Sequence, residues 1–252
     1  MDGGVETKRD YSGEVQDRVR FIRELLNESN SKGIVFANSG GKDCALVGIL
    51  CKKACPDTVS LVLPCGVKRN YQEDKKDAIT LCTQFGIENR VIDLKPAYDA
   101  IVAEVSKETG LSDGALKNIA PRLRMQMLYA VSLSEGRLVA GTGNRSEIYI
   151  GYFTKWGDGA YDFNPIADLT VTEVYAFLRE LGAPKCVLEK PPSAGLYEGQ
   201  TDESDLGFTY DDLDRFLLFG EASETNRKLF MMRHNSTANK RRLPPVYEKS
   251  KG

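Results

Sequence analysis

The sequence predicts a doubly wound α/β fold, in which helices cover both faces of a mostly parallel sheet. Short apolar runs alternate through the first half of the chain with amphipathic segments about 10–15 residues long, a pattern typical of βαβ units. Glycine-containing loops follow the first and the last of these runs. Ligands of open α/β sheets bind beyond the carboxyl ends of the strands, so these two loops are the expected binding region.

Apolar spacing predicts each element of the first half in turn. Val15, Val19 and Ile22 recur at helical spacing and predict a helix over residues 14–29, after a polar start, 1–13, that we expect to be frayed. The uninterrupted apolar run at 33–37 predicts a buried strand, followed by a largely buried helix from Cys44. Further strands are predicted at 59–63, 90–94 and 138–141, and further helices at 72–85, 98–107 and 119–134. Pro121 would then stand in the first turn of a helix, where proline is tolerated.

The last third is less regular. A helix is predicted over 168–181, and short helices over 210–219 and 223–233. Between them, residues 190–209 are rich in glycine, proline and acids, and a loop near 20 residues long is usually functional. We expect 194–209 to be a mobile lid. No segment has the composition of a linker, so residues 1–252 are predicted to form a single domain.

Composition excludes several classes of protein. The 252 residues are 41% hydrophobic and 28% charged, as in a globular protein with a substantial core. With 34 basic and 36 acidic residues the net charge is −2, which argues against nucleic acid as a partner held by bulk electrostatics. No uncharged stretch approaches the roughly 20 residues of a membrane span, and no apolar leader follows Met1. We therefore expect a cytoplasmic protein with no membrane partner.

Cysteine and histidine usage limits the chemistry. The six cysteines form no CxxC motif and are expected to be reduced, mostly as small buried hydrophobes. His234 is the only histidine, which argues against Ser-His or Cys-His nucleophilic catalysis.

The loop between the first strand and its helix carries the strongest local signal, Asn38-Ser-Gly-Gly-Lys-Asp-Cys. Glycines allow close backbone approach, and free N–H groups at a helix start bind anions such as phosphate. Lys42 adds positive charge, and Asp43 is a candidate Mg²⁺ ligand. Phe36 stands where a Walker A loop needs glycine, so that motif is excluded. On these residues alone, an ordinary Gly-Gly turn stays open as the alternative.

Glu147 is a candidate second metal ligand, because it and Asp43 follow strands of one parallel sheet and could converge on one Mg²⁺. The alternative is an acid that merely stabilises the first turn of a helix.

Ser39-Gly-Gly-Lys-Asp resembles the SGGxD pyrophosphate loop of the ATP pyrophosphatase superfamily, which usually has Ser or Thr where this chain has Cys44. Later segments, in the same order, resemble NAD synthetases from about residue 16 to residue 247. They begin at Gly141, Gly151, Asn164 and Glu189, and the last is the terminal Lys240-Arg241.

The resemblance implies an ammonia-dependent NAD synthetase. Such enzymes are cytoplasmic homodimers that require Mg²⁺. They adenylate the nicotinate carboxylate of deamido-NAD with ATP, release pyrophosphate, and let ammonia displace AMP.

The resemblance also assigns roles to residues of this chain. Catalytic roles fall to Lys42, Asp43 and Asp162, and Mg²⁺ ligation to Asp43 and Glu147. ATP contacts fall to Ala37, Asn38, Ser39, Gly40, Gly41, Lys42, Asp43, Cys44, Thr142 and Ser193. Deamido-NAD contacts fall to Arg122, Lys155, Asp162, Asn239 and Lys240. Two positions depart from the family pattern: Val171 replaces an ATP-binding lysine, for which Lys42 or Lys190 are candidate substitutes, and Asn239 replaces a histidine.

Two alternative functions remain at this point. One is a tRNA-modifying adenylase of the same superfamily, which the lack of CxxC and the net charge disfavour. The other is a non-catalytic nucleotide-binding relative, which the departures at Cys44, Val171 and Asn239 would favour and the two metal carboxylates disfavour.

Overall fold

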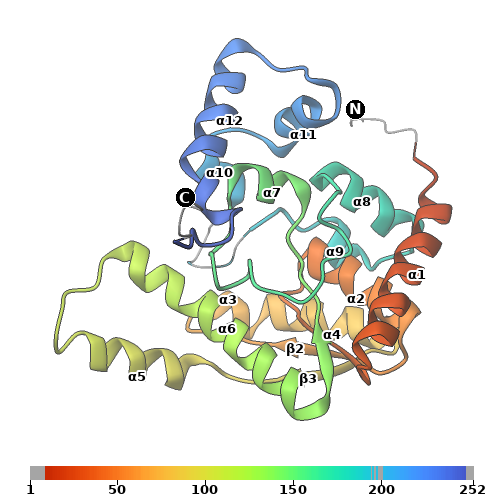
Figure 1. Ribbon diagram of the computed structural model, residues 1–252, viewed down its shortest axis with the longest axis horizontal. Helices are drawn as coiled ribbons and strands as arrows, with labels where there is room; N and C mark the ends of the chain where they lie inside the picture. Colours follow the sequence, from red (N-terminus) through yellow and green to blue (C-terminus); the bar gives the residue numbers. More distant parts are fainter. Residues whose placement is uncertain (1–8, 194, 196, 198–200, 248–252) are drawn as a thin grey trace, which may run out of the picture.

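A computed structural model of the protein describes residues 9–193, 195, 197 and 201–247 (Figure 1). Within these residues the sheet has the parallel strands β1 (Gly33–Ala37), β2 (Thr58–Val62), β3 (Glu88–Val91) and β4 (Arg137–Val139), in the order β3-β2-β1-β4. The chain runs outward from β1 to β3 and then crosses back to place β4 on the other side of β1. The strand order therefore reverses between β1 and β4, which confirms the doubly wound α/β fold.

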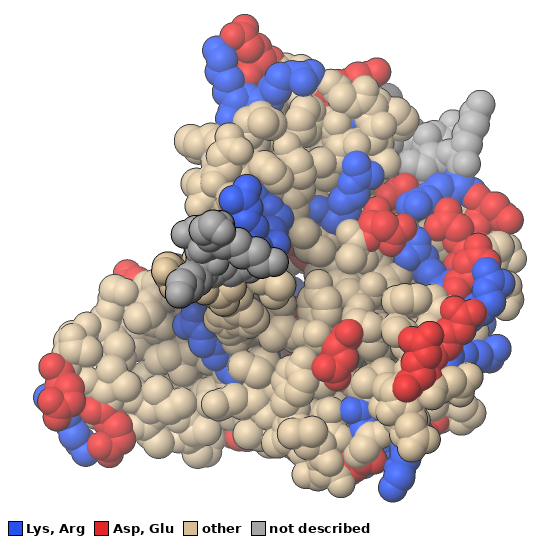
Figure 2. Space-filling view, viewed as in Figure 1, with Lys and Arg blue, Asp and Glu red and all other residues tan. Residues whose placement is uncertain are grey.

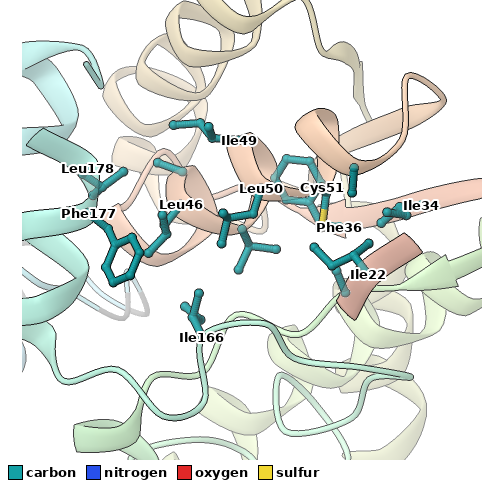
Figure 3. Close-up of a cluster of buried hydrophobic side chains, with 14 of the residues drawn as sticks. Ile22, Ile34, Phe36, Leu46, Ile49, Leu50, Cys51, Ile166, Phe177 and Leu178 are labelled. Atoms are coloured by element: carbon teal, nitrogen blue, oxygen red, sulfur yellow. The ribbon is translucent and has the colours of Figure 1, made fainter. Parts of the chain in front are cut away.

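Helices cover both faces of this sheet. On one face lie α1 (Tyr11–Ser29), α2 (Lys42–Ala54), α4 (Glu73–Phe85) and α8 (Val171–Glu180), and on the other α5 (Lys95–Val105) and α6 (Asp113–Glu135) (Figure 1). Successive residues of a strand point to opposite faces. Accordingly, Ile34 and Phe36 of β1 belong to the core beneath α1 and α2 (Figure 3), whereas Val35 belongs to the core beneath α6.

Close packing fixes α2, whose first turn carries Lys42, Asp43 and Cys44 of the predicted phosphate-binding loop at residues 38–44, called the phosphate loop below. The helix is apolar nearly all round, and Leu46, Ile49 and Leu50 are fully buried. A Cβ at Gly48 would lie only 2.6 Å from the ring of Phe36, so glycine is what allows this helix to approach the strand so closely. The start of α2 is thereby held at the carboxyl end of β1.

The second half of the chain builds a cap over the carboxyl ends of the strands (Figure 1). Its helices are α7 (Arg145–Ile150), α10 (Asp202–Leu206), α11 (Tyr210–Phe219), α12 (Glu224–Ser236) and the 3₁₀ turn Ala238–Lys240, whereas α9 (Lys185–Leu188) packs against α2 and α8. Ile150, Phe208, Leu213 and Phe230 form the centre of a separate core there. The short α3 (Lys68–Tyr71) follows β2.

The start of the chain differs from the expectation for residues 1–13. Helix α1 begins at Tyr11, and the Asp10 carboxylate accepts a hydrogen bond from the Gly13 amide at 3.0 Å. Arg9 forms ion pairs at 2.8 Å with Glu14 and with the buried Glu173 of α8. Residues 9–13 thus have local partners and one distant partner, Glu173, and residues 1–8 lie outside the described part of the chain.

The prediction for Pro121 was wrong. Helix α6 begins at Asp113, where the Ser112 hydroxyl accepts from the Ala115 amide at 3.2 Å, so Pro121 stands in the helix interior. Proline there costs one backbone hydrogen bond. Burial of Leu123 and Leu128 against the sheet stabilises the helix on either side of the break, and Pro121 itself lines the cavity described below.

The predicted loop at 190–209 contains a helix. Thr201 caps α10, and Leu206 and Phe208 are buried in the core of the cap. Of the expected lid at 194–209, residues 194, 196 and 198–200 lie outside the described residues, so its mobility stays a prediction. No helix in the described ranges has the length and apolarity to cross a bilayer.

Candidate active site

A cavity of about 480 Å³ lies between the sheet and the cap, where the loops after β1 and β4 meet. This is the point of strand reversal at which doubly wound sheets bind ligands. Residues 37–44, 140–143, 190–193, α6 and α10 contribute to its wall.

The phosphate loop is held in shape by its own polar groups. The buried Asn38 side chain accepts from the Gly40 amide at 3.0 Å and donates to Ser60 Oγ at 3.2 Å. Gly40 has φ = +70°, and a Cβ there would lie 2.5 Å from the carbonyl oxygen of Asp74. The loop therefore needs glycine at this position, for its backbone conformation and for its contact with α4.

Lys42, Asp43 and Glu147 form a charged cluster in the cavity wall. Lys42 Nζ lies 2.7 Å from Asp43 Oδ2 and 3.9 Å from Glu147 Oε1. Burial disfavours the charged ammonium, but the two carboxylates outweigh this effect and raise the pKa of Lys42. Tyr210 of α11 covers the ammonium, with its ring centre 5.7 Å away.

Asn144 ties the two carboxylates together. Its side-chain amide donates to Asp43 Oδ1 at 3.0 Å, and its side-chain oxygen accepts from the Glu147 amide at 2.9 Å. Glu147 Oε2 in turn accepts from the Asn144 amide at 3.1 Å, which completes a capping box at the start of α7. The sequence analysis missed Asn144, although Asn three residues before Glu was the available signal.

The donor set fits Mg²⁺. Burial, followed by the nearby Asp43 charge, raises the pKa of Glu147 well above its ordinary value, so the pair gains from an added cation. Among the described residues no cluster offers three or more acidic, histidine or cysteine ligands. Two carboxylates with the remaining positions left to phosphate oxygens and water is a usual magnesium arrangement.

Most of the predicted ATP-binding residues line this cavity. They are Ala37, Asn38, Ser39, Gly41, Lys42, Asp43, Cys44, Thr142 and Ser193. Cys44 is buried with its sulfur 3.4 Å from Ser39 Oγ, and burial raises the pKa of the thiol. Gly40 is not part of the cavity lining and contacts α4 instead.

Val171 and Lys190 occupy different places. Val171 is buried in the core of the cap, away from the cavity lining. Lys190 lines the cavity beside the phosphate loop, 3.4 Å from the Gly40 carbonyl oxygen, and forms ion pairs with Asp74 at 2.8 Å and Asp77 at 2.9 Å. Two lysines were candidates to replace the ATP-binding lysine of the family. Lys190 lies beside the loop backbone, and Lys42 lies within the charged cluster.

Of the predicted deamido-NAD residues, the cavity lining includes Lys240. Its ammonium donates to the carbonyl oxygens of Gly151 and Phe153, both at 2.7 Å, and burial lowers its pKa.

The other four lie outside the lining of this single chain: Arg122, Lys155, Asp162 and Asn239. Arg122 is exposed on α6. The Asp162 carboxylate accepts from the Tyr129 hydroxyl at 3.1 Å and from the Val139 amide at 2.8 Å. Lys155 Nζ donates to the Asn239 carbonyl oxygen at 2.6 Å. A contact between these side chains and a ligand remains a prediction.

The cavity also contains residues that the motifs did not indicate. The main ones are Asn70, Asp74, Arg124, Tyr175 and Asp202. They come from α3, α4, α6, α8 and α10, and no local pattern distinguishes them from structural residues of the same types.

The comparison with known sequences identifies the family, since residues 14–251 match NAD synthase. The chain belongs to the NAD synthase family. An NH(3)-dependent NAD(+) synthetase of Carboxydothermus hydrogenoformans is 43% identical over 231 residues, covering 90% of this chain and 94% of that protein.

Solved structures of this family have the same fold. NMN synthetase from Francisella tularensis superposes with a TM-score of 0.90 at 34% identity, over 96% of this chain and 100% of that one. NH3-dependent NAD synthetase from Campylobacter jejuni superposes with a TM-score of 0.79 at 29% identity, over 95% and 100%.

Proposed function

We propose that the protein amidates deamido-NAD with ammonia and converts ATP to AMP and pyrophosphate. The observation that carries this proposal is that the loop at residues 38–44, which includes Asp43, lines one cavity together with Glu147. Family membership and the names of the relatives support the same reaction.

The loop and the charged cluster suit the binding of a triphosphate. Residues at the start of α2 line the cavity, and the free N–H groups of a helix start attract anions. Asp43 and Glu147 would hold Mg²⁺, which when bound neutralises phosphate charge and orients the triphosphate. Lys42 adds a fixed cation beside both carboxylates.

The chemistry needs no nucleophile from the protein. An oxygen of the nicotinate carboxylate attacks the α-phosphorus, and the bond to the bridging α–β oxygen breaks, which releases pyrophosphate. Ammonia then attacks the acyl carbon, AMP leaves with the electrons of the C–O bond, and a proton is lost to give the amide.

Neither the cysteine of the cavity nor the histidine of the chain is placed for nucleophilic catalysis. The Cys44 thiol is buried with a raised pKa. The His234 ring stacks on Tyr149, and its Nδ1 lies 2.9 Å from the Tyr149 carbonyl oxygen, outside the cavity lining. Catalysis then depends on positioning and charge stabilisation.

The test is product analysis with Mg²⁺, ATP, ammonium and deamido-NAD. We expect one AMP and one pyrophosphate for each NAD formed, and ATP–pyrophosphate exchange that requires deamido-NAD. ADP and phosphate as products would exclude the proposal, and exchange that requires tRNA would favour the tRNA-modifying adenylase.

A second acceptor, nicotinate mononucleotide, is suggested by the similarity to the Francisella tularensis protein named NMN synthetase. Both acceptors present the same carboxylate and differ in the adenylyl half. Comparing kcat/KM for the two acceptors at saturating ATP decides between them. A higher value for nicotinate mononucleotide would show that it, and not deamido-NAD, is the preferred substrate.

We also propose that two copies of the chain associate. Helix α5 has no buried residue, and its Ile101 and Val105 are exposed. Figure 2 shows few charged side chains over α5 and α6 in that view, apart from those at the tip of the pair. A partner covering this face would bury the apolar surface and bring a second chain close to Arg122. A monomer mass in solution together with full activity would contradict this.

A cytoplasmic location is part of the same proposal. All six cysteines are free, as in proteins of a reducing compartment.

A further inference from the structure

Arg124 is a cavity residue that lies two positions after the exposed Arg122 on α6. Its Nε donates to the Leu63 carbonyl oxygen at 3.1 Å, just beyond the end of β2. One terminal nitrogen lies 3.5 Å from the Asn70 side-chain oxygen. These two contacts hold the guanidinium in the cavity wall.

The Arg124 charge has no close counter-ion among the described residues, since none of their Asp or Glu oxygens lies within 4.0 Å of it. Lys42 and Lys190 in the same wall both have carboxylates within 3 Å. Asp158 and Asp74 attract Arg124 only from beyond 4.0 Å, and the Asp74 oxygens contact Asn70 at 2.8 Å and Lys190 at 2.8 Å instead.

This arrangement is unfavourable in the empty protein. Burial lowers the pKa of the Arg124 guanidinium, which shows that the charged form is poorly compensated. A partly buried cation without a close counter-ion pays for its lost hydration, and a bound anion would offset that cost.

We propose that Arg124 binds an oxyanion of the substrates and is a binding residue of the amidation site. This inference rests on the proposed function, which supplies two oxyanions: a phosphate of ATP and the nicotinate carboxylate. A planar guanidinium with free N–H groups matches either of them. The fork geometry explains why arginine, rather than lysine, would be needed.

The experiment compares the variants Arg124→Gln and Arg124→Lys with the full-length protein. Arg23→Gln is the matched control. Arg23 also donates from Nε to a backbone carbonyl at 3.1 Å, but it is exposed on α1 and lies outside the cavity lining. Three ligands are tested separately by thermal shift and calorimetry: Mg²⁺-ATP, deamido-NAD, and NAD, which carries an amide in place of the carboxylate.

Without ligand, we expect the melting temperature of Arg124→Gln to be no more than about 4 °C below that of the parent. Its affinity for one ligand should fall by about 10–100-fold, with a matching loss in kcat/KM. A fall for ATP identifies phosphate as the oxyanion. A fall for deamido-NAD that removes its difference from NAD identifies the carboxylate. Arg124→Lys should show most of the same loss, and Arg23→Gln none.

Unchanged ligand affinities in a folded Arg124→Gln variant would overturn the inference. So would failure of both Arg124 variants to fold, since the guanidinium would then be a structural support. If the parent enzyme makes no NAD, the proposed function fails, but the ATP-binding arm still tests Arg124 independently.

Discussion

The side-chain amide of Asn144 donates to the carboxylate of Asp43 at 3.0 Å, although 101 positions separate the two residues in the chain. The same side chain caps α7 and so positions Glu147. One residue thus connects the loop after β1 to the loop after β4, and it contacts both residues whose carboxylates we propose as Mg²⁺ ligands.

Asn144→Ala should therefore reduce activity more than stability. Losing the cap should cost about 1–2 kcal/mol of unfolding free energy. The freed carboxylates should also lower the apparent Mg²⁺ affinity, measured from activity against Mg²⁺ concentration. Thr170→Ala is the control, because Thr170 caps α8 in a capping box of the same kind and does not line the cavity. Equal effects of both variants on Mg²⁺ dependence would contradict this role for Asn144.

Glu147→Gln should nearly abolish adenylation while leaving the metal-free protein folded. Partial burial and then the repulsion by the nearby Asp43 charge raise the pKa of Glu147. Removing one charge relieves that repulsion, so the melting temperature without Mg²⁺ should be maintained. The rise in melting temperature on adding Mg²⁺-ATP should disappear. Glu180→Gln, an exposed change on α8, should retain that rise.

Gly40→Ala should disrupt the phosphate loop. Gly40 has φ = +70° and would place a Cβ 2.5 Å from the Asp74 carbonyl oxygen. Gly86→Ala is a close control, because Gly86 has φ = +64° but nothing within 4 Å of an added Cβ. The backbone penalty of about 1–2 kcal/mol is common to both. Gly40→Ala should lose additional stability and ATP affinity in calorimetry, and retained ATP binding would show that the loop tolerates the change.

Acid should weaken the protein partly through Glu135. Hydrogen bonds from Arg90 and then Arg137 lower the pKa of Glu135 to about 2 from an ordinary value of 4.5. A carboxyl whose pKa is lowered by folding stabilises the protein above its unfolded pKa and loses that contribution as the pH falls through the folded one. Glu135→Gln should therefore lose less stability than the parent in urea unfolding between pH 4.5 and 2. Parallel curves for the two proteins would refute this.

The nitrogen donor should be free ammonia. Glutamine use requires a nucleophilic cysteine with an activating base, and the described cavity offers Cys44 without a histidine. Ammonium must lose a proton before it attacks, so the rate at fixed total ammonium should rise with pH. Supplying glutamine or ammonium chloride separately tests this, and equal rates of NAD formation would show that the donor was misidentified.

The sequence by itself determined the order of the four strands and of the longer helices, and the place of the two loops that line the cavity. Apolar periodicity is local, so the strand at residues 33–37 was predicted with its observed bounds. The loop motif is local too, because Gly40 adopts the turn and Lys42 and Asp43 stand in the first turn of the helix that follows.

Only the tertiary structure decided which side chains meet in the cavity. The sequence alone does not distinguish Arg122 from Arg124, since both are arginines of one helix. Two positions correspond to about 200° of rotation, so the two side chains point in nearly opposite directions. Which of them faces the cavity depends on how α6 packs against the sheet, through residues such as Leu123 and Leu128. The same holds for Arg9 and Asn144, whose partners Glu173 and Asp43 are distant in the chain and become neighbours only when the sheet and its helices assemble.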